Sequence, residues 1–409
     1  MNWPMVQLQE LARPEKGSIV SGPFGSNIGS RFFVEEGVPV IRGNNLTVGR
    51  EKFIDEGFVF LTEEKASEFK NCGAIKDDII FTAAGTIGQV GLIPENTKFE
   101  KYIISNKQLR VRIDTSKANP VFVYYWLTTR EMNRHIIGLN NGGAVPLINL
   151  SIIRKLPVPL PPYEKQEKIV SIISAYDSLI ENNHRRIQLL EQSARLLYRE
   201  WFVHLRFPGH EHVRIIDGVP EGWETLELSD ICSDIRETVK PEQVKSDTPY
   251  IGLEHMPRKS ITLMEWGKSE QVTSNKFKYR KGDILFGKIR PYFHKVGLTF
   301  TDGITSSDAI VIRSKNQKLA HLLLMVVSSD HFVAVTSETV REGSKMPRAD
   351  WKVLKKYKIM IPPLLLLENF NDIIKSITSQ LEILSFQIHK LQQARDILLP
   401  RLMNGEITV

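Results

Sequence analysis

Two stretches of this chain repeat the same heptad pattern, which restricts the possible folds more than any other feature of the sequence. In residues 169–201 apolar side chains recur at alternating steps of four and three, and residues 370–402 follow the same rhythm. Such spacing is typical of the contact seam of a coiled coil, and either helix would be roughly 50 Å long. Asn183 and Arg395 are the polar interruptions. The other seam positions are Ile169, Ile173, Tyr176, Ile180, Ile187, Leu190, Ala194, Leu197 and Trp201, and Phe370, Ile374, Ile377, Leu381, Leu384, Ile388, Leu391, Leu398 and Leu402.

The chain also contains a long internal repeat. The two seams begin 201 residues apart, at Ile169 and Phe370, and other features recur at similar distances. These features are Pro146 with Pro347, Pro162 with Pro363, and the strand-like segments 39–41 with 249–251, 77–81 with 282–286 and 90–92 with 296–298. The small differences in distance indicate that loop lengths differ between the copies while the framework strands persist.

We therefore interpret the chain as an α+β protein in which a mixed α/β globular domain is followed by a long helix, twice. The first domain is placed at 1–157, the proline-rich join and first helix at 158–208, the second domain at 209–358 and the second helix at 359–409. Two such repeats can be related by a pseudo-two-fold axis, with the helices paired as an antiparallel coiled coil. The alternative is that each helix packs only on its own domain, but a strict heptad is not needed for that.

Local patterns predict short elements inside the first domain. Alternating or continuous apolar runs predict strands at 39–42 and 77–81 and a half-buried strand at 108–113. A helix is expected over 120–134, with its aromatic residues in the core. The segment 17–30 is rich in Gly and Ser and predicts a loop.

Composition narrows the class of protein without naming a partner. With 409 residues, 42% of them hydrophobic and 25% charged, the chain suits two or more soluble domains. It contains neither a membrane-spanning stretch nor an export signal at its start, so a cytoplasmic protein with no membrane partner is expected. Cys72 and Cys232 are far apart and are expected to be packing residues. The net charge of +7 favours a polyanionic partner.

Two segments of this sequence partly match known catalytic motifs, but each lacks an essential residue. Residues 282–289 resemble a phosphate-binding loop, but Ile289 stands where a hydroxyl group must reach Mg²⁺. Residues 161–163 resemble part of an amino-methyltransferase motif, but Leu160 replaces the amide or carboxylate that would hold the amino group. The ten histidines show no metal-binding spacing. We therefore expect no catalytic residue, metal or cofactor in this chain.

What remains is a set of polar and basic residues in the loops of both domains. Arg and Lys can bind guanine and Asn or Gln can bind adenine in the major groove, while other side chains hold phosphates. For any single residue an ordinary solvated loop is the simpler interpretation, but the run 288–292 is stronger because basic and aromatic residues alternate beside a strand end. The DNA-binding candidates are Arg42, Asn44, Asn45, Thr86, Gln89, Asn106, Lys107, Asn140 and Asn141 in the first domain, and His255, Lys288, Arg290, Tyr292, His294, Lys295, Ser306, Ser307, Lys345 and Arg348 in the second.

Motifs at the domain joins carry a family resemblance. They are 156–162 with Gln166 and Ile169, the residues 200–202 that close the first helix, 220–223 at the start of the second domain, and 398–407 near the end of the chain. With the overall layout, they resemble the specificity (S) subunit of type I restriction-modification systems over essentially the whole sequence. Lys165 departs from the acidic residue usual in the family, and 364–367 lack the acid–glutamine pair, although the second heptad continues.

The resemblance implies a non-catalytic subunit with two target-recognition domains. Each domain would read one half of a bipartite sequence in double-stranded DNA, and the coiled coil would set the gap and bind the partners. These partners would be two methyltransferase (M) subunits, which bind S-adenosylmethionine, and motor-nuclease (R) subunits, which use ATP and Mg²⁺. Half-sites one duplex turn apart are separated by roughly 34 Å, which helices of this length can span.

Two other classes of function stay open on the sequence alone. One is a coiled-coil scaffold that joins two ligand-binding domains without any role in DNA recognition. Binding insensitive to salt would favour that scaffold, because phosphate contacts release counterions. The other is a self-sufficient nuclease, which metal-dependent cleavage by the isolated chain would establish.

Overall fold

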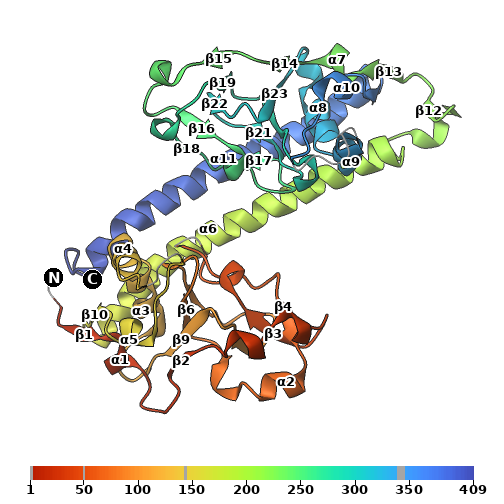
Figure 1. Ribbon diagram of the computed structural model, residues 1–409. Coiled ribbons are helices and arrows are strands. Elements are labelled where there is room, and N and C mark those ends of the chain that lie inside the picture. Colours follow the sequence, from red (N-terminus) through yellow and green to blue (C-terminus); the bar gives the residue numbers. More distant parts are fainter. Residues whose placement is uncertain (1–2, 49–50, 142–144, 339–345) are drawn as a thin grey trace. The chain divides into compact units, whose positions relative to one another are not determined.

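In the computed structural model, the heptad stretches form the two longest helices, α6 (Tyr163–Tyr198) and α11 (Leu364–Met403) (Figure 1). The structure describes residues 3–48, 51–141, 145–338 and 346–409. The chain divides into two compact units. Unit 1 comprises Met1–Ser178 with Leu391–Val409, and unit 2 comprises Leu179–Lys390. Each unit therefore holds one globular domain and a part of both long helices.

Within unit 2, α6 and α11 form an antiparallel coiled coil. Asn183 donates from Nδ2 to Oε1 of Gln387 at 3.3 Å, and the ring of Trp201 lies 5.7 Å from the ring of Phe370. Residue numbers thus rise along α6 while they fall along α11. The predicted seam positions are buried or half-buried along both helices, because the heptad places them all on one face.

The same pairing occurs in unit 1, where it is tied to the globular domain. Arg395 donates from Nη1 to Oδ1 of Asp177 at 2.9 Å, which joins the two helices at the polar interruption of the second seam. The hydroxyl of Tyr125 donates to Oδ2 of the same carboxylate at 2.6 Å. Asp177 therefore links both helices to the domain, and a role for Arg395 and Asn183 in setting the register remains a prediction.

The first long helix ends differently from the expected regular heptad. After Tyr198 the chain makes a π-helical turn over Arg199–Val203, and both Trp201 and Phe202 are buried. The ring of Phe202 lies 4.8 Å from that of Phe370. The π-helical turn changes the angle between successive side chains, and in this turn both aromatic residues face inward.

In its described residues, unit 1 contains two four-stranded sheets and a small two-stranded sheet. Its elements are β1 (Met5–Gln7), α1 (Leu8–Leu11), β2 (Ile19–Ser21), β3 (Val38–Ile41), β4 (Val59–Leu61), α2 (Glu63–Ser67), β5 (Gly73–Ala74), β6 (Asp78–Thr82), β7 (Val90–Leu92), β8 (Tyr102–Ile104), β9 (Gln108–Arg112), α3 (Pro120–Leu127), α4 (Arg130–Gly138), α5 (Leu150–Arg154) and β10 (Pro157–Pro159). The strand orders are β2-β9-β6-β7, β4-β3-β8-β5 and β1-β10. β3 and β8 pair parallel, and the other pairs are antiparallel.

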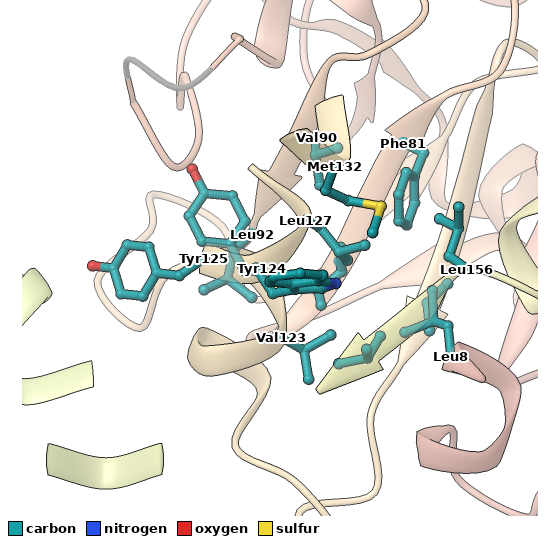
Figure 2. Packing of buried hydrophobic residues seen from close by; sticks show 14 of the residues in the cluster. Leu8, Phe81, Val90, Leu92, Val123, Tyr124, Tyr125, Leu127, Met132 and Leu156 are labelled. Carbon is teal, nitrogen blue, oxygen red and sulfur yellow. The ribbon is translucent and has the colours of Figure 1, made fainter. Parts of the chain in front are cut away.

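The main core of unit 1 lies between the β2-β9-β6-β7 sheet and the helices. Figure 2 shows Leu127 of α3 in one cluster with Phe81 of β6 and Leu8 of α1. Ile169 of α6 and Leu402 of α11 belong to the same cluster. The paired helices therefore share a continuous core with the sheet that carries the loops discussed below.

The single helix expected over 120–134 is wrong, because the chain forms two helices there. α3 begins after Asn119, whose side chain accepts from the N–H of Val121, and ends at Leu127. Thr129 then caps α4, with its hydroxyl accepting from the N–H of Met132. A β-region cap residue cannot lie inside a continuous helix, so two caps at this spacing produce two helices.

Two further local expectations are corrected. The strand at 108–113 is buried on both faces rather than half-buried, because Leu109 and Val111 pack in the cluster with the helices and the segments around Gly17 and Gly73 cover Arg110. Arg110 donates to the carbonyls of Gly73 and Gly17. The segment 17–30 is not entirely loop, because it begins with the edge strand β2.

Unit 2 repeats this architecture with additional strands. Its elements are β11 (Ile215–Ile216), β12 (Val219–Pro220), β13 (Glu224–Glu227), α7 (Leu228–Ile231), β14 (Cys232–Ile235), β15 (Thr238–Val239), β16 (Pro249–Ile251), β17 (Thr262–Leu263), β18 (Gly267–Lys268), β19 (Lys276–Tyr279), β20 (Ile284–Gly287), β21 (Val296–Thr299), β22 (Gly303–Thr305), β23 (Ala309–Ser314), α8 (Ala320–Val327), α9 (Asp330–Glu338), α10 (Trp351–Leu354) and β24 (Lys358–Ile361). The strand orders are β14-β23-β20-β21-β17, β15-β19-β22-β16-β18, β13-β24 and β11-β12. β16 and β22 pair parallel, as β3 and β8 do in unit 1. The second domain is therefore a structural copy of the first.

The helices α8 and α9 complete the core of unit 2. Most side chains of α8 are buried, and Phe332 of α9 packs against Phe286 of β20 with ring centroids 5.8 Å apart. Among the described residues, no single helix has the length and apolar character needed to cross a membrane. One bent pair, Gln317–Val327 with Asp330–Glu338 at 67°, meets the criterion by length and composition alone.

Candidate nucleic-acid interface

A buried ion pair supports the central strands of each unit. Arg112 donates to Asp78 from Nε at 2.8 Å and from Nη2 at 2.7 Å, and Arg313 donates to Asp283 through the same two atoms at 2.7 Å each. Each aspartate also accepts the backbone N–H of the residue three positions before it. These hydrogen bonds raise the pKa of both arginines. The two ion pairs are equivalent, and we call each of them, with its strands, the buried frame of its unit. Both lie at the ends of β6 and β20 opposite to the candidate loops.

In unit 1, the loops at the other end of β6 surround a hollow of about 430 Å³. Gln89 joins the loops around the hollow, because its Nε2 donates to the carbonyls of Gly43 and Leu46 at 3.1 and 2.9 Å. Its Oε1 accepts from the hydroxyl of Thr82 at 2.9 Å. The lining residues are Gly43, Asn44, Thr82, Ala84, Gly85, Thr86, Gln89, Lys107 and Gln108. The fold thus brings together candidates from three separate loops.

The candidates of unit 1 fall into two groups. The exposed ones are Asn44, Thr86, Asn106, Lys107, Asn140 and Asn141. Of these, Asn44 also donates to the carbonyl of Gly57 and Asn140 also accepts from the N–H of Leu147. The other candidates are buried or half-buried and support the loops. Asn45 is fully buried and donates to the carbonyls of Ile54 and Glu56, while Arg42 is half-buried and donates to the carbonyl of Gly57 at 3.4 Å. The side chains of Asn45 and Gln89 are therefore occupied in shaping the surface that the exposed residues present.

Unit 2 builds the corresponding loops on the same scaffold. Lys295 donates from Nζ to the carbonyl of Leu253, as Gln89 donates to Gly43 in unit 1. Arg290 donates its backbone N–H to the carbonyl of Pro347 at 2.8 Å, and Gly85 makes the equivalent bond to Pro146. Both Gly85 and Arg290 adopt positive φ, at 91° and 50°. The left-handed turn is therefore retained, although unit 2 places a bulky residue in it.

The candidates of unit 2 differ widely in exposure. Arg290, Tyr292, Ser307 and Arg348 are exposed, and His255, Lys288, Lys295 and Ser306 are half-buried. His294 is only 7% exposed, and its Nε2 lies 2.9 Å from the carbonyl of Ser328, so it is a core residue. Lys345 lies outside the described residues. The exposed set, Arg290 and Tyr292 above all, is the part of this list that can meet a ligand directly.

Charge in the unit 2 loops is modulated by local contacts. Lys288 donates from Nζ to the carbonyl of Ser307 at 3.0 Å, and burial lowers the pKa of Lys288 and of Lys295. Arg348 lies 3.4 Å from the carboxylate of Asp308. Arg290 has no such acidic neighbour among the ion pairs of the described residues. It is therefore the cation of this loop best placed to bind an anionic ligand.

Two features of unit 1 were missed by sequence reasoning. Gln108 is fully buried and lines the hollow, and its Nε2 has no hydrogen-bond partner among the described residues. Phe24 is 84% exposed, the largest exposed fraction among the large hydrophobic residues that the structure describes. The sequence did contain a sign that Phe24 is exposed. It lies between Gly22-Pro23 and Gly25 in a polar loop, where no apolar neighbours are available to bury its ring.

Neither cysteine is part of a reactive site. Burial raises the pKa of Cys232 to about 12 and also raises that of the half-buried Cys72. Such thiols are poor nucleophiles at neutral pH. In the part of the chain that the structure describes, no three His, Cys, Asp or Glu side chains gather as metal ligands.

Two copies of one domain that present different polar loops, together with an antiparallel coiled coil, define a two-domain protein built by internal repetition. The family model described as "Type I restriction modification DNA specificity domain" matches residues 2–192 and 220–395. The chain therefore belongs to the family of type I restriction-modification specificity subunits, which are non-catalytic and carry two target-recognition domains.

Individual relatives agree with this assignment. The chain is 22% identical over 426 aligned positions to the MjaIX specificity subunit of Methanocaldococcus jannaschii, covering all of this chain and 94% of the relative. It is 22% identical over 375 positions to the HindI specificity subunit of Haemophilus influenzae, covering 75% of this chain and 82% of the relative. The S subunit of the type I system of M. genitalium has a similar fold, with a TM-score of 0.58, 14% identity, and coverage of 98% of this chain and 96% of that chain.

Proposed function

We propose that each target-recognition domain, placed at 1–157 and 209–358, reads one half of a bipartite sequence in double-stranded DNA. The observation that supports this proposal most strongly is that the two units carry opposite charges at the position just before β9 and β23. The framework is the same in both units, but unit 1 presents Lys107 there and unit 2 presents Asp308. A reader of two different half-sites needs this combination of constant support and divergent surface.

The chemistry of the exposed loop residues suits duplex DNA. Asn44 and Asn106 can form paired hydrogen bonds with adenine, and Arg290 can do so with guanine. Lys107 can bind a phosphate and fix the position of the duplex. Gln108 adds a buried donor without a partner at the edge of the hollow. A bound base edge or an ordered water would satisfy this donor.

The coiled coil is proposed to set the gap between the two half-sites. Removing one heptad, at 180–186 in α6 and at the facing 384–390 in α11, shortens both helices by about 10 Å while it keeps the seam in register. The expected result is a specified gap shorter by about three base pairs. Shortening α6 alone, by removing 180–186, is the control, and it should abolish assembly because α11 keeps its full length and the seam positions of the two helices no longer face each other. An unchanged gap in the matched variant would mean that the coiled coil does not measure the distance.

The outer surface of α6 in unit 2 is the proposed binding site for a methyltransferase subunit. A cavity of about 810 Å³ lies beside this helix and its π-helical turn, with a mainly apolar lining. Leu196 and Val203 line this cavity and are about half exposed, and Arg199 adds a positive charge. Exposed apolar residues around a concave surface with a cationic rim are typical of protein interfaces.

This binding site can be tested separately from DNA recognition. Leu196→Asp and Val203→Asp should each reduce co-purification of the methyltransferase at least tenfold, because both place a charge in a buried apolar contact. Leu189→Asp changes another exposed leucine of α6 that does not line the cavity, so it serves as the matched control. Undiminished association of both test variants would place the interface elsewhere.

No cofactor is proposed for this chain. S-adenosylmethionine is assigned to the two methyltransferase subunits, and ATP with Mg²⁺ to the motor-nuclease subunits of a complex in the cytoplasm. The chain's own contribution is to position the duplex, because its polar side chains supply hydrogen bonds and charge rather than a reactive group.

A methylome is the experiment that tests the proposed function. The chain is expressed with the methyltransferase subunit of its own system in a host without such methylation, and modified bases are mapped across the genome. Two short specified blocks separated by a fixed gap are expected. No new methylation, with both proteins folded and associated, would contradict DNA recognition. A single contiguous block would mean that only one domain reads DNA.

A further inference from the structure

Phe24 lies on a loop that holds its side chain outward. The loop follows β2, and its start is fixed because Gly22 donates its N–H to the carbonyl of Gln108 at 3.0 Å. A Cβ on Gly22 would lie 1.9 Å from the carbonyl oxygen of Ser105, so this approach requires glycine. The loop is therefore packed directly against the turn between β8 and β9 that carries Asn106 and Lys107.

The other side of the loop is fixed as well. The carbonyl of Phe24 accepts the N–H of Asn27 at 2.8 Å in a 3₁₀ turn over Gly25–Asn27. Arg31 donates from Nη2 to the carbonyl of Ser26 at 3.0 Å, and Ile28 is buried in a hydrophobic cluster. The aromatic ring is therefore exposed at the tip of an ordered loop, which limits the conformational entropy lost when it binds a ligand.

The position of the ring relates it to the DNA-reading candidates. A Cβ on Gly25 would lie 2.9 Å from Nδ2 of Asn106, so the residue next to Phe24 touches a candidate base-reading side chain. Asn106 is followed by Lys107, which lines the hollow. The loop that exposes Phe24 thus lies against the turn that carries the candidate amide and the candidate cation.

We propose that Phe24 inserts its ring against a base step of the half-site read by unit 1. This inference rests on the proposed function and adds a specificity-determining residue to it. Apolar side chains inserted between base pairs unstack the step and favour sequences that deform easily, and a phenyl ring can also stack on a base. Burial of the ring against the duplex would explain why the loop holds a phenylalanine that is 84% exposed in the free chain.

The segment of unit 2 that corresponds to the Phe24 loop has a different structure. After β14, which is equivalent to β2, the chain enters β15, where Val239 is 5% exposed and pairs with β19. Its exposed aromatic residue is Tyr292, which is 54% exposed on the loop after β20. The proposed insertion therefore concerns only the half-site of unit 1.

The test uses the full chain with its methyltransferase and a DNA duplex that contains the target found by the methylome. Phe24→Ala should weaken binding about 5- to 150-fold, the range expected for loss of one base–aromatic stack. Phe24→Trp should bind within about threefold of the parent. With 2-aminopurine placed in turn at the adenines of the first half-site, one position should brighten on binding of the parent and not of Phe24→Ala.

The control variant is Ile75→Ala, an exposed hydrophobic residue of unit 1 at the opposite end of β6, and it should leave binding unchanged. Unfolding midpoints should not differ between Phe24→Ala and the parent, because the side chain makes few contacts. Full affinity and full 2-aminopurine fluorescence with Phe24→Ala would overturn the inference. Loss of methyltransferase association would overturn it in favour of a protein contact. The absence of any methylated target would instead contradict the proposed function itself.

Discussion

Units 1 and 2 share a buried frame but differ where the chain leaves that frame. Asp78 with Arg112 and Asp283 with Arg313 form the same bidentate ion pair in both units. The left-handed turn after the central strand is also shared, but it is Gly85 in unit 1 and the exposed Arg290 in unit 2. Two domains can therefore keep one interior while they present different hydrogen-bonding groups.

The difference extends to whole segments. The chain after β2 forms the loop that exposes Phe24, whereas the chain after β14 forms β15 and buries Val239. Lys107 of unit 1 corresponds to Asp308 of unit 2, so the charge at this position is reversed. Loops tolerate such changes because they carry little of the core, and recognition residues accumulate there for the same reason.

The largest expected effect comes from exchanging one unit's domain. Replacement of residues 1–155 by those of another family member should change one half of the methylated target and leave the other half and the gap unchanged. The methylome of the chimera measures this directly. The reciprocal exchange of 209–358 is the control and should change only the other half. A change in both halves after either exchange would refute independent reading.

Breaking the shared ion pairs should destabilise each unit separately. Asp78→Asn and Asp283→Asn each remove a buried carboxylate from its half-buried arginine, at a cost of about 3 kcal/mol. Hydrogen exchange measured by mass spectrometry should show faster exchange of β6 and β9 in the first variant and of β20 and β23 in the second. Asp234→Asn breaks the more exposed pair with Arg236 and should cost less than about 1 kcal/mol. Loss of protection in the unit that was not mutated would show that the frames are coupled.

The left-handed turn offers a pair of opposite substitutions. Gly85→Ala should destabilise unit 1 by about 1 kcal/mol, and Arg290→Gly should stabilise unit 2 by a similar amount, because a side chain at positive φ is strained. A Cβ on Gly85 meets no atom within 4 Å, so the effect is one of the backbone alone. Arg290→Lys keeps both the strain and the charge and serves as the control. Unfolding midpoints that shift in the same direction for both test variants would contradict the equivalence of the two turns.

The smallest expected effect is a difference in acid sensitivity. Burial lowers the pKa of His184, His294 and His321, all of them in unit 2, whereas the single histidine of unit 1, His135, is exposed. A histidine whose folded pKa is below its unfolded value of about 6.5 stabilises the fold fully above that pH, and this contribution is lost as the pH falls below it.

Hydrogen exchange at pH 7.5 and 5.5, corrected for the intrinsic rate, should therefore show a greater loss of protection in unit 2 than in unit 1. His294→Gln should reduce this difference, because an amide can still donate to the carbonyl of Ser328 without titrating. His135→Gln is the control and should change nothing. Equal losses in both units would show that other groups determine the acid response.

The sequence by itself determined the long-range plan of this protein. The two heptad seams, the repeat of about 201 residues and the family motifs are patterns of spacing along the chain, and spacing is retained whatever the loops do. The seams accordingly form α6 and α11, and the strand-like segments at 39–41 and 249–251 form β3 and β16 within one or two residues. Helix boundaries were harder to predict, because capping residues compete with continuation of the helix. The two caps that divide 120–138 into α3 and α4 show this.

Only the tertiary structure decided how the candidate DNA-binding surface is composed. Asp78 and Arg112 are 34 residues apart, and Gln89 and Gly43 are 46 apart, so the sheet register and not the local sequence brings them together. The pairing of strands also buries Asn45 and His294, which are DNA-binding candidates in the sequence. It also places the loop that exposes Phe24 against the turn that carries Asn106. Burial depends on which strands become neighbours, and this information is distributed over the whole domain.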